Sequence, residues 1–187
     1  PVAYMSGIDT VRESVEDDDA GRFVQELVND EIKPTIDLPK DEMDAFASSV
    51  IERFKNPFIR HELMSIALNS TTKFKTRLLP TYNDYRAKFG KSPKHILFSF
   101  ASLCVFYKGK RGGQDIALAD DQKYLDFWKE LWTKTDYTDI AKTVLSRKDI
   151  WEQDLSADDD NVAVVAGYIE SIVKNGERAA LKAFLGE

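Results

Sequence analysis

The sequence predicts an all-α fold in a single multi-helical domain of 187 residues. Apolar residues recur at steps of three and four along most of the chain, which is the spacing of one face of a helix. Alternating strand patterns are nearly absent, and most of the few glycines and prolines fall between the periodic segments. A chain of this length buries about 70% of its unfolded surface, so such a helical core needs no disulfide.

Capping residues and prolines set the boundaries of the predicted helices. Thr10, with Glu13 three residues later, predicts a capping box, and Pro34 ends the second helix. Ser92 and Pro93 predict a cap followed by a first-turn proline. The glycines between 109 and 113 predict a loop. The expected helices span 10–17, 18–33, 39–55, 58–89 with a kink or stop at Pro80, 93–108, 120–134, 136–146, 161–175 and 177–185.

Charge is distributed unevenly along the chain, whose net charge is −6. Residues 1–52 contain 4 Lys and Arg against 14 Asp and Glu, and residues 112–187 contain 9 against 16. Residues 53–111 contain 13 Lys and Arg, and their only acids are Glu62 and Asp84. This basic block suits either charge complementarity between packed helices or an anionic ligand near the middle of the chain. The pI near 5.1 and the lack of an aromatic RNA-binding signature argue against a nucleic-acid partner.

The chain lacks the residues that several classes of function require. The chain has no dinucleotide-binding glycine fingerprint, no P-loop and no HExxH motif. Two histidines and one cysteine cannot form a structural Cys/His zinc site. The longest apolar run, 96–107, is too short to span a bilayer, and no signal peptide is apparent, so no membrane partner is expected. A single cysteine favours a reducing compartment, and we expect a cytoplasmic protein.

Three reactive or charged features receive structural interpretations. Cys104 lies on the apolar helix 93–108 and is expected to be a core thiol. His95 opens the same helix beside Lys94 and is expected at the surface or as a capping residue. The acidic run 16–19 lacks the spacing and the glycine turn of a calcium loop, so we expect a solvated junction between two helices.

The most specific polar pattern follows residue 61. If an unbroken helix runs through 70–72, residues at 100° steps form one polar sector opposite an apolar side. This sector holds hydroxyls, an amide, an imidazole and an ammonium but no carboxylate, which suits a polyhydroxylated, anionic small molecule. An ordinary solvated helix face is the alternative. The sector consists of His61, Ser65, Asn69, Thr72, Lys73 and Thr76.

The same region resembles a known enzyme family. Residues 53–80 read RFKNPFIRHELMSIALNSTTKFKTRLLP, and residues 1–14 read PVAYMSGIDTVRES. Both runs are similar to the C-terminal domain of the polyol-specific long-chain dehydrogenases, which include mannitol dehydrogenases and hexuronate reductases. The resemblance covers essentially the whole chain, is strongest over 1–35 and 53–80, and is weak after about 112.

The resemblance implies a two-domain enzyme that needs no metal. An N-terminal Rossmann domain would bind NAD, and residues 1–187 would be the helical C-terminal domain that closes over the substrate. The catalytic Lys-x4-Asn-x2-His motif of the family is not found in this chain and is expected a few residues before Pro1. We therefore expect no catalytic or cofactor-binding residue within the chain, and no activity from the chain alone.

Four substrate-binding residues follow from the resemblance. Arg53 and Asn56 match an Arg-Phe-x-Asn-Pro motif and would reach the far hydroxyls or the carboxylate of the substrate. His61 occupies a position where hexuronate enzymes carry histidine and mannitol dehydrogenases tend to carry aspartate, which would repel an acid substrate. Lys73 is the expected partner of the substrate carboxylate. Two weaker candidates, each with a structural alternative, are Asn69 and Arg77.

The implied reaction is the NAD-dependent interconversion of D-tagaturonate and D-altronate. Within the same family, fructuronate reduction and mannitol oxidation are alternatives. A different class of function also remains open, namely a non-catalytic helical module whose basic block docks an acidic protein surface. The resemblance leaves the choice between NAD and NADP to the missing domain.

Overall fold

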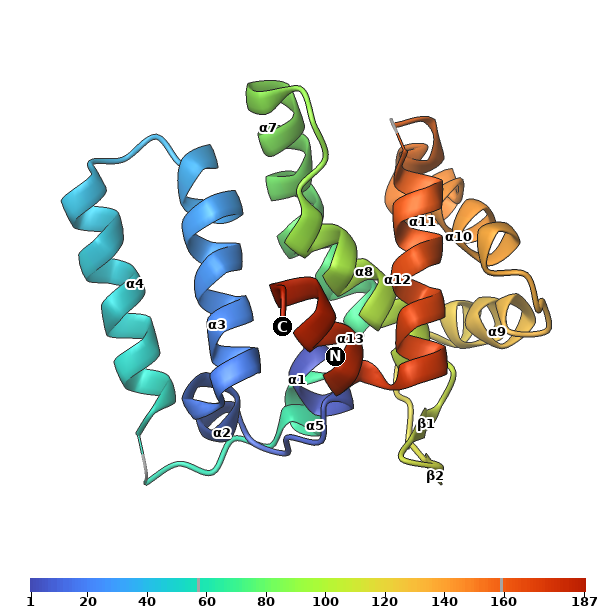
Figure 1. The fold of residues 1–187 in the computed structure, drawn as a ribbon, viewed down its shortest axis with the longest axis horizontal. Coiled ribbons are helices and arrows are strands. Elements are labelled where there is room, and N and C mark those ends of the chain that lie inside the picture. The colour runs from blue at the N-terminus through green and yellow to red at the C-terminus, as the bar shows by residue number, and fades with distance from the viewer. Residues whose placement is uncertain (57, 159) are drawn as a thin grey trace.

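The computed structural model describes residues 1–56, 58–158 and 160–187 and confirms the all-α fold class (Figure 1). In the described part, the only paired strands are β1 and β2, a short antiparallel hairpin where a loop was predicted. The elements are α1 (Val2–Met5), α2 (Val11–Glu16), α3 (Asp18–Glu26), η1 (Leu27–Ile32), η2 (Lys33–Thr35), α4 (Lys40–Phe54), α5 (Leu63–Ile66), α6 (Ser70–Lys73), η3 (Phe74–Leu78), α7 (Leu79–Phe89), α8 (Lys94–Phe106), β1 (Lys110–Arg111), β2 (Gln114–Asp115), α9 (Gln122–Leu131), α10 (Tyr137–Leu145), α11 (Lys148–Trp151), η4 (Leu155–Ala157), α12 (Asn161–Asn175) and α13 (Glu177–Leu185).

The hydrophobic core is built around α8. Almost every side chain of this helix is apolar and buried, which is the pattern of a helix enclosed on all sides. α8 packs against α12, and α12 in turn packs against α10 and α13. Cys104 is fully buried in this core, as predicted, and burial raises the pKa of its thiol. Each buried large apolar side chain contributes about 1.5–3 kcal/mol relative to its exposed state.

The start of the chain folds as its capping residues predict. Thr10 accepts from the Glu13 N–H group, and the Glu13 carboxylate accepts from the Thr10 N–H group, which completes the capping box. Gly21 allows α3 to approach the end of α2, since a Cβ atom there would lie 2.8 Å from the Val15 carbonyl oxygen. The helix after α3 widens into a π-helical turn, η1, and ends in a 3₁₀ turn that contains Pro34.

The predicted position of His95 is wrong. Its side chain is fully buried at the first turn of α8, and both ring nitrogens face carboxylates. Nδ1 lies 2.9 Å from Glu31 Oε1, and Nε2 lies 3.1 Å from Glu26 Oε2. The predicted Ser92 cap is also replaced, because the Glu31 carboxylate accepts from the backbone N–H groups of His95 and Ile96. An anionic cap from another element serves the positive end of α8.

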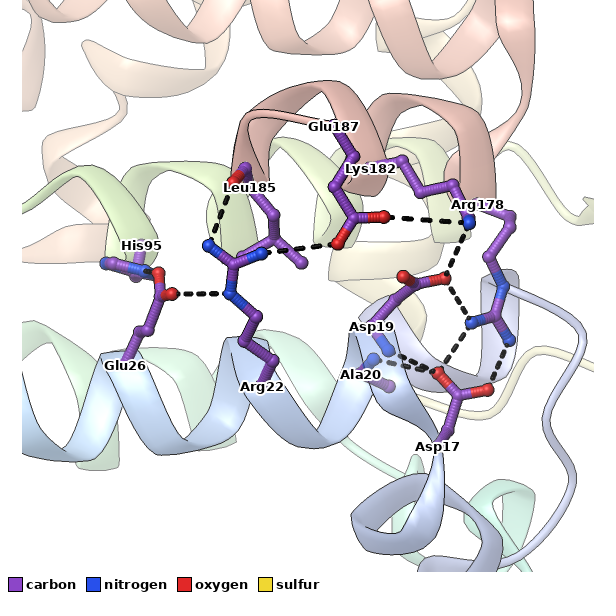
Figure 2. A network of polar contacts seen from close by, with 10 residues as sticks. All are labelled: Asp17, Asp19, Ala20, Arg22, Glu26, His95, Arg178, Lys182, Leu185 and Glu187. Atoms are coloured by element: carbon purple, nitrogen blue, oxygen red, sulfur yellow. Dashed lines mark hydrogen bonds and ion pairs between the residues drawn. The ribbon is translucent and has the colours of Figure 1, made fainter.

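The acidic run is also less solvated than expected. Asp17 caps α3 by accepting from the N–H groups of Asp19 and Ala20, and it faces both terminal nitrogens of Arg178. Asp19 is buried and lies 2.9 Å from Arg178 Nη1. Figure 2 shows these carboxylates turned toward the side chains of α13. The run is thus the attachment point for the C-terminal helix.

A second contact in the same network joins the middle of α3 to the end of α13. Arg22 pairs with Glu26 on its own helix and also donates to the Leu185 carbonyl and the Glu187 carboxylate (Figure 2). α3 is therefore attached to α13 along its length. α4 stands outside it at one end of the molecule, and none of the α4 side chains is buried (Figure 1).

Candidate functional site

The four predicted substrate-binding residues lie between the end of α4 and α6. Arg53 is exposed in the last turn of α4, and His61 is exposed in the irregular segment that follows. The Asn56 side-chain oxygen accepts from the Phe58 N–H group at 3.0 Å, a local turn that fixes the amide. Lys73 is partly buried at the end of α6. Within residues 1–56, 58–158 and 160–187, no hydrogen bond or ion pair joins any two of these four side chains.

The unbroken polar helix that the sequence predicted does not form. α5 ends at Ile66, and Asn69 adopts a left-handed conformation with φ of 54° before α6 begins. A left-handed residue interrupts a right-handed helix, and asparagine tolerates this conformation better than most residues. The Asn69 N–H group donates to the Ala119 carbonyl oxygen at 2.9 Å instead of to a helical partner. The residues of the predicted sector therefore belong to two short helices and the turn between them.

Lys73 closes this turn. Its ammonium donates to the Ile66 carbonyl oxygen at 2.7 Å, which is the end of α5. A lysine ammonium has three donors, so two remain for a ligand. The contact fixes the cation beside the α5–α6 turn. Arg77 is exposed in the π-helical turn η3, and the exposed Asn69 serves as the left-handed turn residue.

A buried network that sequence reasoning missed anchors α6. The Thr71 N–H group lies 3.1 Å from both the Tyr107 hydroxyl and an Asp120 oxygen. Trp128 Nε1 donates to the Thr71 hydroxyl at 3.0 Å, and its ring stacks on Tyr107. Burial, together with the Tyr107–Asp120 hydrogen bond, raises the pKa of the Tyr107 phenol. These partners come from three distant segments, so no local pattern signals the network.

The segment that carries His61 is tied to the start of the domain. Thr10 and Glu62 form an isolated antiparallel bridge. The Val11 N–H group donates to the His61 carbonyl at 2.9 Å, and the Leu63 N–H group donates to the Asp9 carbonyl at 2.8 Å. The backbone at His61 is thus held against the residues that lead into α2, while its side chain stays exposed.

The charges of this region divide into paired and unpaired groups. Arg60 pairs with Glu62, and a hydrogen bond to Glu62 raises the pKa of the guanidinium. Lys55 lies 3.5 Å from Glu52. With respect to the residues that the structure describes, the side chains of Arg53 and His61 form no hydrogen bond or ion pair. Arg53 and His61 therefore have side chains that are available to a ligand, whereas the carboxylate of Glu62 is already paired with Arg60.

The described residues offer neither a dinucleotide fold nor a metal cluster. No helix connects parallel strands in them, since β1 and β2 form only an antiparallel hairpin, so they lack the unit that binds a dinucleotide. No three His, Cys, Asp or Glu side chains gather in an arrangement that could hold a metal ion in this part of the chain. None of its helices has both the length and the apolar character needed to cross a membrane.

The chain is similar to a known protein family and to curated relatives. Residues 1–173 match the family described as the mannitol dehydrogenase C-terminal domain. The altronate oxidoreductase of Yersinia pestis bv. Antiqua (strain Nepal516) is 42% identical over 189 residues, which is 98% of this chain. The altronate oxidoreductase of Pectobacterium carotovorum subsp. carotovorum (strain PC1) is 40% identical over 194 residues, again 98% of this chain.

A solved structure shares the fold. The mannitol 2-dehydrogenase of Pseudomonas fluorescens, in a ternary complex with NAD and D-mannitol, superposes with a TM-score of 0.87 over 100% of this chain and 37% of its own, at 20% identity. The chain spans only 39% and 40% of the two altronate oxidoreductases. The family match over residues 1–173 and the shared helical fold lead to one conclusion: the chain belongs to the mannitol dehydrogenase C-terminal domain family.

Proposed function

We propose that residues 1–187 are the substrate-binding C-terminal domain of an NAD-dependent oxidoreductase that interconverts D-tagaturonate and D-altronate. The observation that carries this proposal is the identity of 42% and 40% to two altronate oxidoreductases over 98% of the chain. The second candidate is a polyol dehydrogenase, favoured by the fold shared with mannitol 2-dehydrogenase. That likeness has only 20% identity, so it carries less weight for the choice of substrate.

The exposed cations near α4 and α6 support an acidic substrate. A guanidinium binds a carboxylate through two parallel hydrogen bonds, and Arg53 has no competing partner among the described residues. Lys73 has two donors left after its contact with Ile66. We propose that Arg53, Asn56, His61 and Lys73 bind the hydroxyls and the carboxylate of the sugar acid.

The role of this chain in the reaction is to position the substrate. When bound, NAD supplies or accepts the hydride, and the preceding domain is expected to hold it. Arg53 and Lys73 would neutralise the carboxylate, and His61 would help to orient the sugar chain, while the domain surface excludes water from the reacting carbon. The group that transfers the proton is expected before Pro1. The proposal includes a cytoplasmic location, which suits the free thiol of the buried Cys104.

The test uses the complete enzyme with single substitutions. Lys73→Gln removes the charge and keeps an N–H donor for the Ile66 carbonyl, so α5 and α6 stay in place. A charge-assisted hydrogen bond is worth about 1.5–3 kcal/mol, so the KM for tagaturonate should rise about tenfold or more, as it should for Arg53→Ala. Lys129→Ala, on the exposed side of α9, is the control and should leave the KM unchanged.

The same assays compare tagaturonate, fructuronate and fructose. The proposal expects turnover of tagaturonate above both others, and it expects the two substitutions to affect the neutral ketose least. A preference for fructose would favour the polyol dehydrogenase instead. No dehydrogenase activity with any of the three would leave the non-catalytic module as the better explanation.

A further inference from the structure

The exposed apolar side chains of this domain are concentrated in one segment. Between residues 36 and 59 the large exposed apolar residues are Ile36, Leu38, Phe46, Phe54, Phe58 and Ile59, which we call the apolar patch. Phe46 is 68% exposed and Phe58 is 92% exposed. Ile36, Leu38, Phe46 and Phe54 also line one groove, and exposed apolar surface that gathers in this way marks an interaction site in soluble proteins.

A groove forms part of the patch. It has a volume of about 910 Å³ and lies between α4 on one side and α3 with η1 on the other. Val24, Val28 and Ile32 line the inner wall, and Phe46 and Val50 line the wall formed by α4. Lys33 bridges the groove by an ion pair of 2.6 Å with Asp44. α4 has no buried side chain and contributes nothing to the core that surrounds α8. α4 is therefore an amphipathic helix whose apolar face this domain leaves partly uncovered.

The patch lies next to the candidate substrate residues in the sequence. α4 ends at Phe54, and Phe58 and Ile59 lie between Asn56 and His61. The patch is therefore continuous in sequence with the residues that, in the proposed function, hold the substrate. Hydride transfer brings the reacting atoms within about 3–3.5 Å, so the part of the protein that carries the cofactor must come close to Arg53 and Asn56, at the end of α4.

The part of the complete protein outside this chain is large enough to cover the apolar patch. The chain spans 39% of the Yersinia altronate oxidoreductase, so more than half of a complete protein of that size lies outside it. A second copy of the domain would cover the patch as well, but it would bring no cofactor to the substrate residues.

We propose that the amino-terminal part of the complete protein packs onto the apolar patch and fills the groove between α3 and α4, with Phe46 and Phe58 as its main contacts. This inference rests on the proposed function for the choice of partner. The packing would stabilise α4 and hold Arg53 and Asn56 at the edge of the substrate cleft. Large aromatic side chains near the centre of an interface usually contribute most of its binding energy.

The test measures thiol reactivity in the complete protein. Phe46→Cys is compared with Ala45→Cys, the neighbouring exposed residue of α4, which does not line the groove. Peptide mass spectrometry follows the maleimide labelling of each site. The labelling rate in the folded protein is divided by the labelling rate of the same site in urea. The inference expects Phe46→Cys to react at least about tenfold more slowly than its unfolded reference, with Ala45→Cys reacting faster than Phe46→Cys. Fast labelling of Phe46→Cys in the folded protein overturns it.

Two further outcomes separate the alternatives. If protection of Phe46→Cys disappears on dilution as a dimer dissociates, a second copy covers the patch and the proposal is wrong. Labelling needs no substrate, so it is independent of the proposed reaction. Protection without hexuronate turnover would refute the proposed function and keep the interface. Turnover with an unprotected Phe46→Cys would refute the interface and keep the function.

Discussion

Glu31 and His95 form a buried pair, although 64 residues separate them in the sequence. One Glu31 oxygen contacts His95 Nδ1 at 2.9 Å and accepts from the His95 N–H group at 2.8 Å. The other ring nitrogen, Nε2, lies 3.1 Å from Glu26 Oε2, so carboxylates from two elements flank the ring. The contact joins η1 to the first turn of the central helix.

Replacement of Glu31 should therefore destabilise the domain strongly. Glu31→Ala leaves two buried backbone N–H groups and His95 Nδ1 without the carboxylate that they contact, which should lower the free energy of unfolding by about 3–5 kcal/mol. Glu31→Gln keeps one acceptor oxygen and should cost less. Urea denaturation followed by circular dichroism gives these values. The exposed neighbour Asp30 serves as the control, and a loss no larger than that of Asp30→Ala would disprove the role of Glu31.

Two helical glycines should respond in opposite directions to alanine. In Gly21→Ala the new Cβ would lie 2.8 Å from the Val15 carbonyl oxygen, so α2 and α3 must separate at a cost of about 1–3 kcal/mol. Gly167 lies in α12, where an added Cβ would meet no heavy atom within 4 Å, so Gly167→Ala should stabilise by about 0.5–1 kcal/mol. Thermal unfolding of both variants tests this contrast. Equal effects of the same sign would contradict the close approach of α2 and α3.

The pH dependence of stability should carry a signature of Glu177. Neither carboxylate oxygen of this buried residue has a hydrogen-bond partner among the described residues, and burial raises its pKa from 4.5 to about 7. The folded state then binds the proton more tightly, so this contribution is present below about pH 4.5 and is lost as the pH rises toward 7. The loss amounts to at most about 3 kcal/mol.

Glu177→Gln removes this titration. The variant should unfold at higher urea concentration than the wild type at pH 7.5, and the difference should shrink toward pH 5. Glu130→Gln, at an exposed position of α9, should follow the wild-type profile. If the stabilities of the wild type and of Glu177→Gln change by the same amount between pH 5 and pH 7, Glu177 is not the source of the pH dependence.

The attachment of α13 should depend on the geometry of Arg178 and not only on its charge. Arg178 places Nη1 2.5 Å and Nη2 2.9 Å from the two oxygens of Asp17. Lysine cannot form this paired contact, so Arg178→Lys should lose most of the stability that Arg178→Gln loses, about 1–2 kcal/mol given its partial exposure. Lys182, 3.8 Å from Asp19 and half exposed, is the control, and Lys182→Gln should change stability little.

The same contact sets an acid limit. Hydrogen bonds from Arg178 hold the pKa of Asp17 below its usual 3.8, so its contribution is present above that pH and is lost as the pH falls. Acid unfolding of Arg178→Gln should consequently begin at a higher pH than that of the wild type. An unchanged acid transition would mean that Asp17 is stabilised by its cap of α3 alone.

Local signals in the sequence predicted most of the helices. The capping box of Thr10 and Glu13, the position of α4 after Pro39, and the bounds of α12 and α13 follow from caps, prolines and apolar spacing. The core location of Cys104 followed from the apolar helix around it. These features depend on neighbouring residues, which is why one sequence is enough to find them.

The errors came from contacts between distant segments. His95 lies beside Lys94, so its neighbours suggest a surface position, whereas its actual partners are in α3 and η1. Asn69 leaves the helix because Ala119 accepts its N–H group, and no pattern near Asn69 reveals that carbonyl. The periodicity of the sequence therefore did not predict the backbone of the candidate site. The residues of the site come from the family resemblance, and their binding roles stay predictions.

The bridge between Thr10 and Glu62 has a mechanical consequence for the site. Two backbone hydrogen bonds make His61 move together with residues 9–11, which lead out of α1. Rotation of the first helices as a rigid unit would swing the imidazole without any rearrangement inside α4. The position of the His61 imidazole therefore depends on the residues that precede α2 as well as on its own segment.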